Sequence, residues 1–278
     1  MTRRTILITG CSSGIGEDTA YALKKKGWRV FASCRKEADC IRLRENGFDS
    51  VVIDYNDHDT IKGGFSSVLE ATDGNLDALF NNGAYGCFGA VEDLPTEGLR
   101  EIFENNFFGW HELTRLVIPV MRTQGHGRII QCSSILGFVY LPWRGAYTAT
   151  KHALEAMSNT LRLELRNTNI HVILLEPGPI TTQFRVNSIP VFERWFDWRN
   201  SPNKLKYESE LLQRLYEERG KKYPFELPPS AVSKKVIHAL EASRPRSHYM
   251  ITGATYLAAL LRWMLPIRTL DRIAARIY

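Results

Sequence analysis

Short apolar runs rich in β-branched residues alternate with helical stretches along most of this chain, and this alternation restricts the fold more than any other feature. The first run, Thr5 to Thr9, ends in a glycine turn, and the helical stretch from Ile15 to Lys26 is closed by Gly27. Further strands are predicted at 28–33, 50–54, 76–80, 128–134 and 248–251, and further helices at 58–71, 99–122 and 230–242. Short apolar strands alternating with helices are typical of a parallel sheet covered on both faces. The sequence therefore predicts the α/β class with a doubly wound parallel sheet.

Length and composition indicate one globular domain. The chain has 278 residues, 44% hydrophobic and 24% charged, without a linker, repeat or low-complexity tract. The net charge of +6 is modest, and the Lys and Arg residues are spread along the chain, which argues against nucleic-acid binding. The cysteines form no C-x-x-C pair and have no His-rich partner, so we expect reduced thiols of a cytosolic protein, no disulfide and no metal site. These cysteines are Cys11, Cys34, Cys40, Cys87 and Cys132.

The turn after the first strand has the residues of a dinucleotide site. Glycines at 10, 14 and 16 allow unusual backbone angles and a close approach of a pyrophosphate to main-chain N–H groups at the helix start. A glycine trio can also be a simple turn, but its place after the first strand favours a dinucleotide. The residues predicted to bind the cofactor in this turn are Gly10, Ser12, Ser13, Gly14, Ile15 and Gly16.

The ends of the next strands predict which dinucleotide is bound. The second strand runs into Arg35 and Lys36, at the position where an acidic residue would bind the 2′-hydroxyl of NAD. Because Arg35 can fork onto a 2′-phosphate, we expect NADP(H), with solvated surface cations as the alternative. Asp54 could accept a hydrogen bond from the adenine amine or merely cap the following helix. At the end of the fourth strand, Asn82 begins a segment of small residues that would let the chain pass close to the cofactor.

Tyr147 and Lys151 are candidates for acid–base chemistry. On a helix, residues four apart share one face, and a neighbouring ammonium favours the phenolate, so Lys151 is expected to lower the pKa of Tyr147 from about 10. Such a pair also occurs on many solvated helix faces. Ser134 is predicted at the C-terminal end of a strand, where open α/β sheets bind ligands, thirteen residues before Tyr147. The two hydroxyls could therefore meet around one carbonyl oxygen, although a serine that caps a turn is the ordinary alternative.

Together these motifs resemble the short-chain dehydrogenase/reductase family, most closely its retinol and 17β-hydroxysteroid dehydrogenase-like branch, which includes bacterial NADP-dependent aldehyde reductases. Roughly residues 5 to 185 carry the resemblance. The family's Asn-Ala-Gly motif appears with its last two residues transposed, as Asn82-Gly83-Ala84. The other matches are Thr9-Gly10-x-x-x-Gly14-x-Gly16 for the cofactor turn, Asn106, Ser134, Tyr147 and Lys151 for the catalytic tetrad, and Pro177 to Thr182 for Pro-Gly-x-x-x-Thr.

The resemblance implies a Rossmann-like fold and hydride transfer between a nicotinamide and a carbonyl carbon. Tyr147 would donate the proton in reduction and accept it in oxidation, and Ser134 would bind the substrate oxygen. Lys151 would also hold the nicotinamide ribose. Asn106 would keep a water in a proton relay through its main chain, and the main chain of Ile180 with Thr182 would hold the carboxamide. The family implies no metal, and its members are usually dimers or tetramers.

Two segments lie outside the resemblance. Residues 183–229 form an insertion whose aromatic residues could be a lid over an apolar pocket or the underside of an irregular loop. These residues are Phe184, Val191, Phe192, Trp195, Phe196, Trp198 and Tyr207. Residues 254–278 have a helical pattern, divided or kinked at Pro266, with an apolar stripe and four arginines. This extension could pack against the same protein, join a second subunit, or rest on a membrane surface.

The function predicted from the sequence is an NADP(H)-dependent oxidoreductase of lipophilic aldehydes, ketones or alcohols, acting as an aldehyde reductase. A steroid or retinol dehydrogenase is the enzymatic alternative, and a catalytically idle NADP(H)-sensing protein is the alternative from another class. The apolar run behind the basic N-terminus is too short for a signal peptide, and no stretch reaches the roughly 18 apolar residues of a membrane-spanning helix. The expected location is therefore cytoplasmic, with peripheral membrane contact through 254–278 as a further option.

Overall fold

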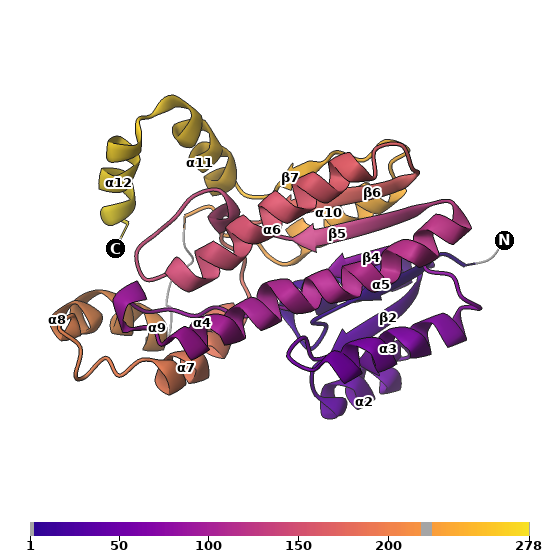
Figure 1. Cartoon of the computed structure of the whole chain (residues 1–278), viewed down its shortest axis with the longest axis horizontal. Helices are drawn as coiled ribbons and strands as arrows, with labels where there is room; N and C mark the ends of the chain where they lie inside the picture. The colour runs from indigo at the N-terminus through magenta and orange to yellow at the C-terminus, as the bar shows by residue number, and fades with distance from the viewer. Residues whose placement is uncertain (1–2, 218–223, 278) are drawn as a thin grey trace.

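A single parallel sheet forms the centre of the molecule in a computed structural model that describes residues 3–217 and 224–277 (Figure 1). Its seven strands lie in the order β3-β2-β1-β4-β5-β6-β7. The strands are β1 (Thr5–Ile8), β2 (Arg29–Cys34), β3 (Asp49–Val52), β4 (Ala78–Asn81), β5 (Gly127–Cys132), β6 (Ile170–Glu176) and β7 (His248–Met250). Every adjacent pair is parallel. The predicted doubly wound α/β fold is confirmed.

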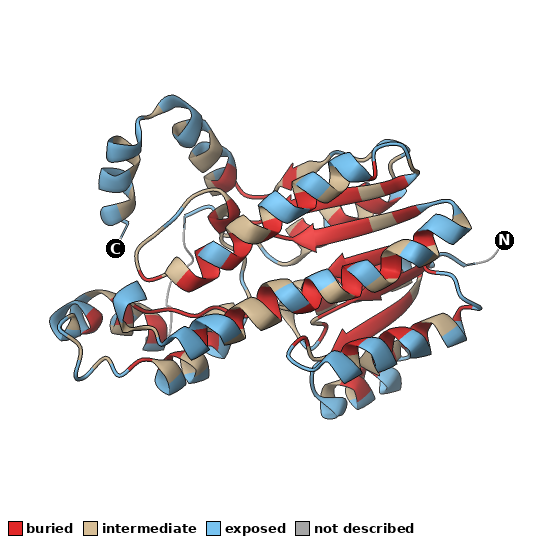
Figure 2. Cartoon of the chain, viewed as in Figure 1, coloured by how far each residue is buried: buried red, intermediate tan, exposed pale blue. Residues whose placement is uncertain are grey.

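Helices cover both faces of this sheet. Those of the sheet region are α1 (Gly14–Lys25), α2 (Glu37–Glu45), α3 (His58–Ala71), α4 (Thr96–Phe103), α5 (Gly109–Gln124), α6 (Gly145–Glu164) and α10 (Ser230–Glu241). Figure 1 shows α3, α5 and α6 in front of the sheet and α10 behind it. The hydroxyls of Thr19 in α1 and Ser233 in α10 lie 3.0 Å apart, which places α1 beside α10. Buried apolar residues lie in every strand except β3, whose Val51 and Val52 are partly buried (Figure 2).

The parallel pairing places the carboxyl ends of all seven strands along one edge. The order reverses between β1 and β4, which are neighbours in the sheet although β2 and β3 separate them in the chain. In open parallel sheets, ligands bind outside the carboxyl ends of the strands at such a switch point. The segments after β1, β4 and β5 therefore face the position where a ligand is expected.

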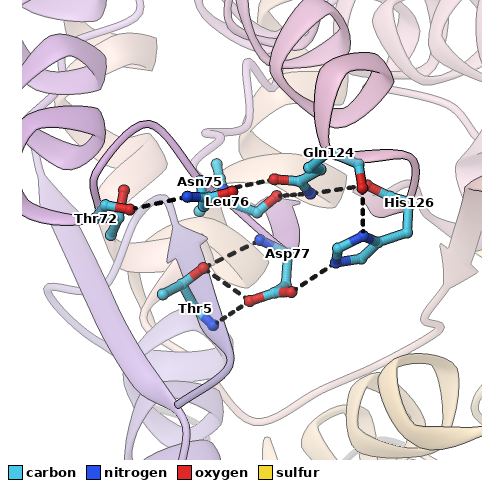
Figure 3. A network of polar contacts seen from close by, with 7 residues as sticks. All are labelled: Thr5, Thr72, Asn75, Leu76, Asp77, Gln124 and His126. Carbon is cyan, nitrogen blue, oxygen red and sulfur yellow. Dashed lines mark hydrogen bonds and ion pairs between the residues drawn. The ribbon is translucent and has the colours of Figure 1, made fainter. Parts of the chain in front are cut away.

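A polar network fixes the opposite edge of the sheet (Figure 3). Oδ2 of Asp77 accepts hydrogen bonds from the Thr5 main-chain N–H at 2.7 Å and the Thr5 hydroxyl at 2.9 Å. Oδ1 of Asp77 lies 2.9 Å from Nε2 of His126, just before β5. The side chain of Gln124 exchanges two hydrogen bonds with the main chain of Leu76. These contacts join the starts of β1, β4 and β5. The register of the strands at the switch point is therefore fixed at their amino ends.

The insertion at 183–229 is largely helical over its described part, while residues 218–223 lie outside the described residues. It contains α7 (Phe184–Trp195), α8 (Lys204–Lys206), a π-helical turn (Tyr207–Leu212) and α9 (Gln213–Tyr216). Its aromatic residues pack in a second apolar cluster, separate from the core under the sheet. That cluster also contains Tyr147, Trp143 and Phe88. The segment is therefore not an irregular loop. The aromatic residues of α7 and of the π-helical turn lie in the same cluster as Tyr147, the catalytic candidate.

The C-terminal extension is a pair of helices, α11 (Gly253–Met264) and α12 (Ile267–Ala275). Pro266 precedes the first residue of α12 and divides the two, as predicted. Figure 2 shows both helices standing out from the body with mostly exposed residues. Within the part of the chain that the structure describes, no helix combines the length and apolar character needed to cross a bilayer.

Three elements differ from the sequence prediction. The stretch 99–122 is not one helix, because a π-helical turn (Glu104–Phe108) separates α4 from α5. Strand β6 was not predicted, although its apolar run Val172 to Leu175 carried the signal. Helix α2 was also not predicted, since only Cys40 and Leu43 of its nine residues are buried and its amphipathic pattern is weak.

Candidate active site

The glycine turn after β1 is packed so closely that side chains would not fit. Gly10 has φ +69°, and a Cβ placed on it would lie 2.5 Å from Cα of Gly83. A Cβ on Gly16 would lie 2.3 Å from the carbonyl oxygen of Gly10. Gly14 adopts φ +64°, a left-handed conformation that favours glycine. The turn thus brings the start of α1 against the segment that follows β4.

Asn82 holds this turn in place. Its side-chain Nδ2 donates hydrogen bonds to the carbonyl oxygens of Thr9 at 3.0 Å and Gly10 at 3.3 Å. Its main-chain N–H donates to the hydroxyl of Thr9 at 2.9 Å. Asn82 was predicted to contact the cofactor, and in the structure its amide positions the turn.

The N-terminus of α1 is suited to a pyrophosphate. Ser13 is the N-cap, yet its side chain makes no capping hydrogen bond, and Ser12 is exposed. The first N–H groups of a helix have no intrahelical partner, and a phosphate placed there satisfies them.

A Cβ on Gly14 would lie 3.1 Å from Cγ2 of Thr182, so the segment after β6 reaches the same turn. Ile180 is partly buried against the core and pairs with Leu227. Ile15, also predicted here, is partly buried against the core.

Two exposed cations follow β2. The side chains of Arg35 and Lys36 have no hydrogen-bond or ion-pair partner among residues 3–217 and 224–277, and Lys36 is the N-cap of α2. Both side chains are therefore available to a ligand, and the preference for NADP(H) stays a prediction. Asp54 follows β3 and accepts a hydrogen bond from the Asn56 main-chain N–H at 3.0 Å. Asp57, and not Asp54, caps α3 by accepting from the N–H groups of Asp59 and Thr60. The helix-capping alternative for Asp54 is wrong.

The structure brings Ser134 and Tyr147 together. Ser134 follows β5, and its hydroxyl accepts a hydrogen bond from the main-chain N–H of Leu136 at 3.1 Å. The Ser134 hydroxyl is close enough to the Tyr147 phenol to act on its pKa: burial raises that pKa, and Ser134 acts to lower it. Tyr147 lies in the first turn of α6 and is 8% exposed. Its ring packs edge-on against Phe184 of the insertion, with ring centroids 5.2 Å apart. The hydroxyls of Ser134 and Tyr147 thus lie beside an aromatic residue of the insertion.

The predicted acidification of Tyr147 by Lys151 is wrong for this structure. Burial raises the pKa of Tyr147 above its ordinary value, and the contribution of Ser134 only partly opposes this effect. Nζ of Lys151 lies 5.6 Å from the Tyr147 ring centroid, 4.2 Å from that of Trp110, and 2.8 Å from the carbonyl oxygen of Cys132, to which it donates. Burial also lowers the pKa of Lys151 to about 8. The Lys151 ammonium is bound to a carbonyl oxygen and its own pKa is lowered. It therefore does not offset the effect of burial on Tyr147, and the phenol stays protonated.

Sequence patterns gave no sign of the Cys132 carbonyl or Trp110 as partners of Lys151. The carbonyl belongs to the main chain, and Trp110 lies in α5, 41 positions before Lys151 in the chain. The indole N–H of Trp110 donates to the carbonyl oxygen of Gly83 at 2.9 Å. Trp110 therefore links the lysine environment to the segment beside the glycine turn.

Asn106 lies within the π-helical turn and is fully buried. Its Oδ1 accepts from the Tyr85 main-chain N–H at 3.2 Å, and its Nδ2 donates to the Tyr85 carbonyl at 2.9 Å. Sequence reasoning noted that asparagine inside a helix requires a special task, and this amide ties the segment after β4 to the α4–α5 junction. A π-turn widens a helix locally and is frequent at functional sites. The proposed main-chain water relay remains a prediction.

An acidic pair lies near Lys151: the partly buried Glu155, one helical turn further along α6, and the buried Glu176 at the end of β6. Possible ligand atoms of Glu155, Glu176 and His248 lie within 4.8 Å of one another. Burial raises the pKa of Glu155 to about 7 and that of Glu176 to about 8. The charges of Lys151 and Arg162 act on Glu155 and His248, respectively, and would repel a metal ion. The cluster is therefore better suited to retaining protons than to holding a divalent cation.

Comparisons with known proteins agree with this geometry. A family model for short chain dehydrogenases matches residues 4–190. The uncharacterized oxidoreductase YbbO of Escherichia coli (strain K12) is 38% identical over 271 residues, covering 98% of this chain and 94% of YbbO. The NADPH-dependent 3-dehydrocapnine reductase of Ornithobacterium rhinotracheale is 29% identical, covering 97% of this chain and 95% of that protein. A solved short chain dehydrogenase/reductase from Burkholderia phymatum in complex with NAD has a TM-score of 0.78 at 22% identity, covering 94% and 93% of the two chains.

Proposed function

Because the chain belongs to the short-chain dehydrogenase/reductase family, we propose that it reduces lipophilic aldehydes or ketones with NADPH. Membership makes the protein an oxidoreductase that acts on alcohol or carbonyl groups, so the alternative of a catalytically idle NADP(H) sensor is not carried further. The observation that carries the proposal is the position of the Tyr147 phenol, which lies beside Ser134 and packs against Phe184, where burial raises its pKa.

The residues present fit a bound dinucleotide. Gly10 and Gly14, both with left-handed backbone, carry no side chain beside the start of α1, and the N–H groups there, which no side chain caps, suit a pyrophosphate. Arg35 and Lys36 at the end of β2 support NADP(H) over NAD(H), because a 2′-phosphate needs cations with no other partner. The NADPH dependence of the 3-dehydrocapnine reductase adds support. When bound, NADPH supplies the hydride.

The chain's own residues would handle the proton and the developing charge. The Ser134 hydroxyl can donate to a substrate carbonyl oxygen and orient it beside the phenol. Tyr147 then donates its proton to that oxygen as negative charge develops there. Lys151, held by the Cys132 carbonyl, keeps positive charge near the resulting phenolate. A raised pKa favours the acid form of Tyr147, which suits the reductive direction.

The lipophilic substrate class is supported by the second apolar cluster. The ring centroids of Phe184 and Phe88 lie 6.0 Å apart, and the ring of Phe184 contacts that of Tyr147. Trp143, Phe192 and Tyr207 continue this aromatic packing through the insertion. Such walls bind apolar chains or rings better than polyhydroxylated substrates. The insertion would then act as the lid of the substrate site.

A substrate panel tests the proposal. Initial rates should be measured with medium-chain aldehydes, ketosteroids, retinal and glyceraldehyde, each with NADPH and with NADH. We expect the highest kcat/KM for a medium-chain aldehyde with NADPH and the lowest for glyceraldehyde. Highest kcat/KM for retinal or a ketosteroid would favour the steroid or retinol dehydrogenase alternative. Equal rates with glyceraldehyde would contradict the lipophilic substrate class.

A further inference from the structure

The C-terminal helix α11 exposes its apolar face to solvent. Its most exposed large apolar residues lie at the spacing i, i+1, i+4, i+7 and i+8, which forms one stripe along a helix. They are Tyr256, Leu257, Leu260, Trp263 and Met264. Trp263 is 85% exposed, and Leu260 is 51% exposed. An amphipathic helix normally buries such a stripe, so α11 is oriented with its apolar side away from its own protein.

The polar side of α11 makes the contact with the body. Thr255 is fully buried, and Arg262, on the side of the helix opposite Leu260, hydrogen-bonds the carbonyl oxygen of Phe138. In α12, Asp271 accepts a hydrogen bond from the Tyr140 hydroxyl at 2.8 Å. The helix pair is thus attached by polar contacts to the connection between Ser134 and Tyr147. Figure 1 shows the pair projecting beyond the end of the sheet where the strands terminate.

Unpaired cations accompany the apolar stripe. Arg268 and Arg272 of α12 and its C-cap Arg276 are exposed and lie at i, i+4 and i+8, on one side of the helix. None of the three guanidinium groups pairs with an acidic group or a carbonyl oxygen among residues 3–217 and 224–277. With Arg262 and the single acidic residue Asp271, residues 253–277 carry four positive charges and one negative, a net charge of +3 (4 − 1). Ile267, 68% exposed, continues the apolar surface onto α12.

We propose that α11 and α12 dock on an anionic lipid surface, with the apolar stripe in the headgroup region and the arginines at the lipid phosphates. Both helices are too short to span a bilayer, and an exposed tryptophan with flanking arginines is the composition of an interfacial helix. A symmetric dimer through this face would bring two copies of the same cationic patch together, because a two-fold interface pairs a surface with itself. Anionic lipid instead complements the charge.

Vesicle sedimentation tests this docking without depending on catalysis. The full chain is mixed with phosphatidylcholine vesicles containing phosphatidylglycerol and, separately, with pure phosphatidylcholine vesicles. We expect binding to the anionic vesicles that weakens as salt rises. Leu260→Asp, and separately the triple change Arg268→Glu, Arg272→Glu and Arg276→Glu, should each reduce partitioning by at least about tenfold.

Leu205→Asp is the matched control, because Leu205 is 78% exposed in α8 of the insertion. This variant should partition like the unaltered protein, and circular dichroism melting should show that all variants fold. Equal partitioning of every variant, or equal binding to neutral and anionic vesicles, would overturn the proposal. Self-association in analytical ultracentrifugation that Leu260→Asp abolishes, without vesicle binding, would assign the face to a second copy and also overturn it.

Discussion

The ammonium of Lys151 donates a 2.8 Å hydrogen bond to the main-chain carbonyl of Cys132 at the end of β5. This contact fixes the lysine between the sheet and α6, where the Trp110 ring covers it. Its charge is therefore held at a defined distance from the Tyr147 ring, 5.6 Å from Nζ to the centroid. The phenol remains in its acid form because burial outweighs the groups that favour the phenolate.

Replacing Tyr147 with Phe tests the proton donor directly. We expect Tyr147→Phe to lower kcat by about 10²- to 10⁴-fold, because the acid is lost while the ring and its contact with Phe184 remain. The Kd for NADPH, measured by fluorescence titration, should stay nearly unchanged. Tyr140→Phe is the control, since that exposed hydroxyl bonds Asp271 and not Ser134. Substantial turnover by Tyr147→Phe would exclude the acid–base role.

Arg35 is expected to set the cofactor preference. Arg35→Ala should raise KM for NADPH by about tenfold or more and leave KM for NADH nearly unchanged, because only the 2′-phosphate needs the guanidinium. Steady-state kinetics with both cofactors gives the ratio. Lys62→Ala removes another exposed cation, in α3, and serves as the control. Equal changes for both cofactors would refute the NADP(H) assignment.

The glycine turn should not tolerate a methyl group. Gly16→Ala places a Cβ 2.3 Å from the Gly10 carbonyl and 2.8 Å from Nδ2 of Asn82, so the turn must shift. We expect a loss of about 1–3 kcal/mol in the free energy of unfolding. Gly63→Ala in α3 is the matched control, because nothing lies within 4 Å of its added Cβ. That change should stabilise the protein by about 0.5–1 kcal/mol, as helix propensity predicts. Urea titrations that show similar effects for both variants would contradict the close packing.

The buried Glu176, close to the partly buried Glu155, should make stability depend on pH. Burial first, and the charge of Glu155 second, raise the pKa of Glu176 to about 8 from 4.5. Between these values the folded state binds more protons than the unfolded state, so its stability is greatest at low pH and is lost as pH rises through about 8. Glu176→Gln should lessen the fall in Tm between pH 6 and 9 by roughly 2–4 °C, about 1 kcal/mol.

Glu70→Gln, at an exposed position in α3, is the control for this titration. Its Tm should fall with pH as steeply as that of the unaltered protein. A Glu176→Gln variant whose Tm follows the same steep curve would show that Glu176 is already ionised in the folded protein.

The chain's local patterns identified most of the strands and the residues at their ends. Apolar β-branched runs predicted six of the strands, and their parallel arrangement placed Gly10, Arg35, Asp54, Asn82 and Ser134 near one edge. This succeeded because parallel strands end at the same edge whatever their order. The shared face of Tyr147 and Lys151 was expected on the condition that their stretch is helical, and the structure places both residues in α6.

Tertiary structure decided what those residues do to one another. Four-residue spacing predicted that Lys151 acidifies Tyr147, but burial of the phenol and the Cys132 carbonyl, a group without a sequence signal, reversed the expected direction. The same holds for Asn82, whose amide positions the turn, and for α11, whose apolar stripe points outward. Sequence periodicity specifies that a helix has an apolar side. Only packing determines whether protein or solvent meets it, because burial depends on contacts between distant parts of the chain.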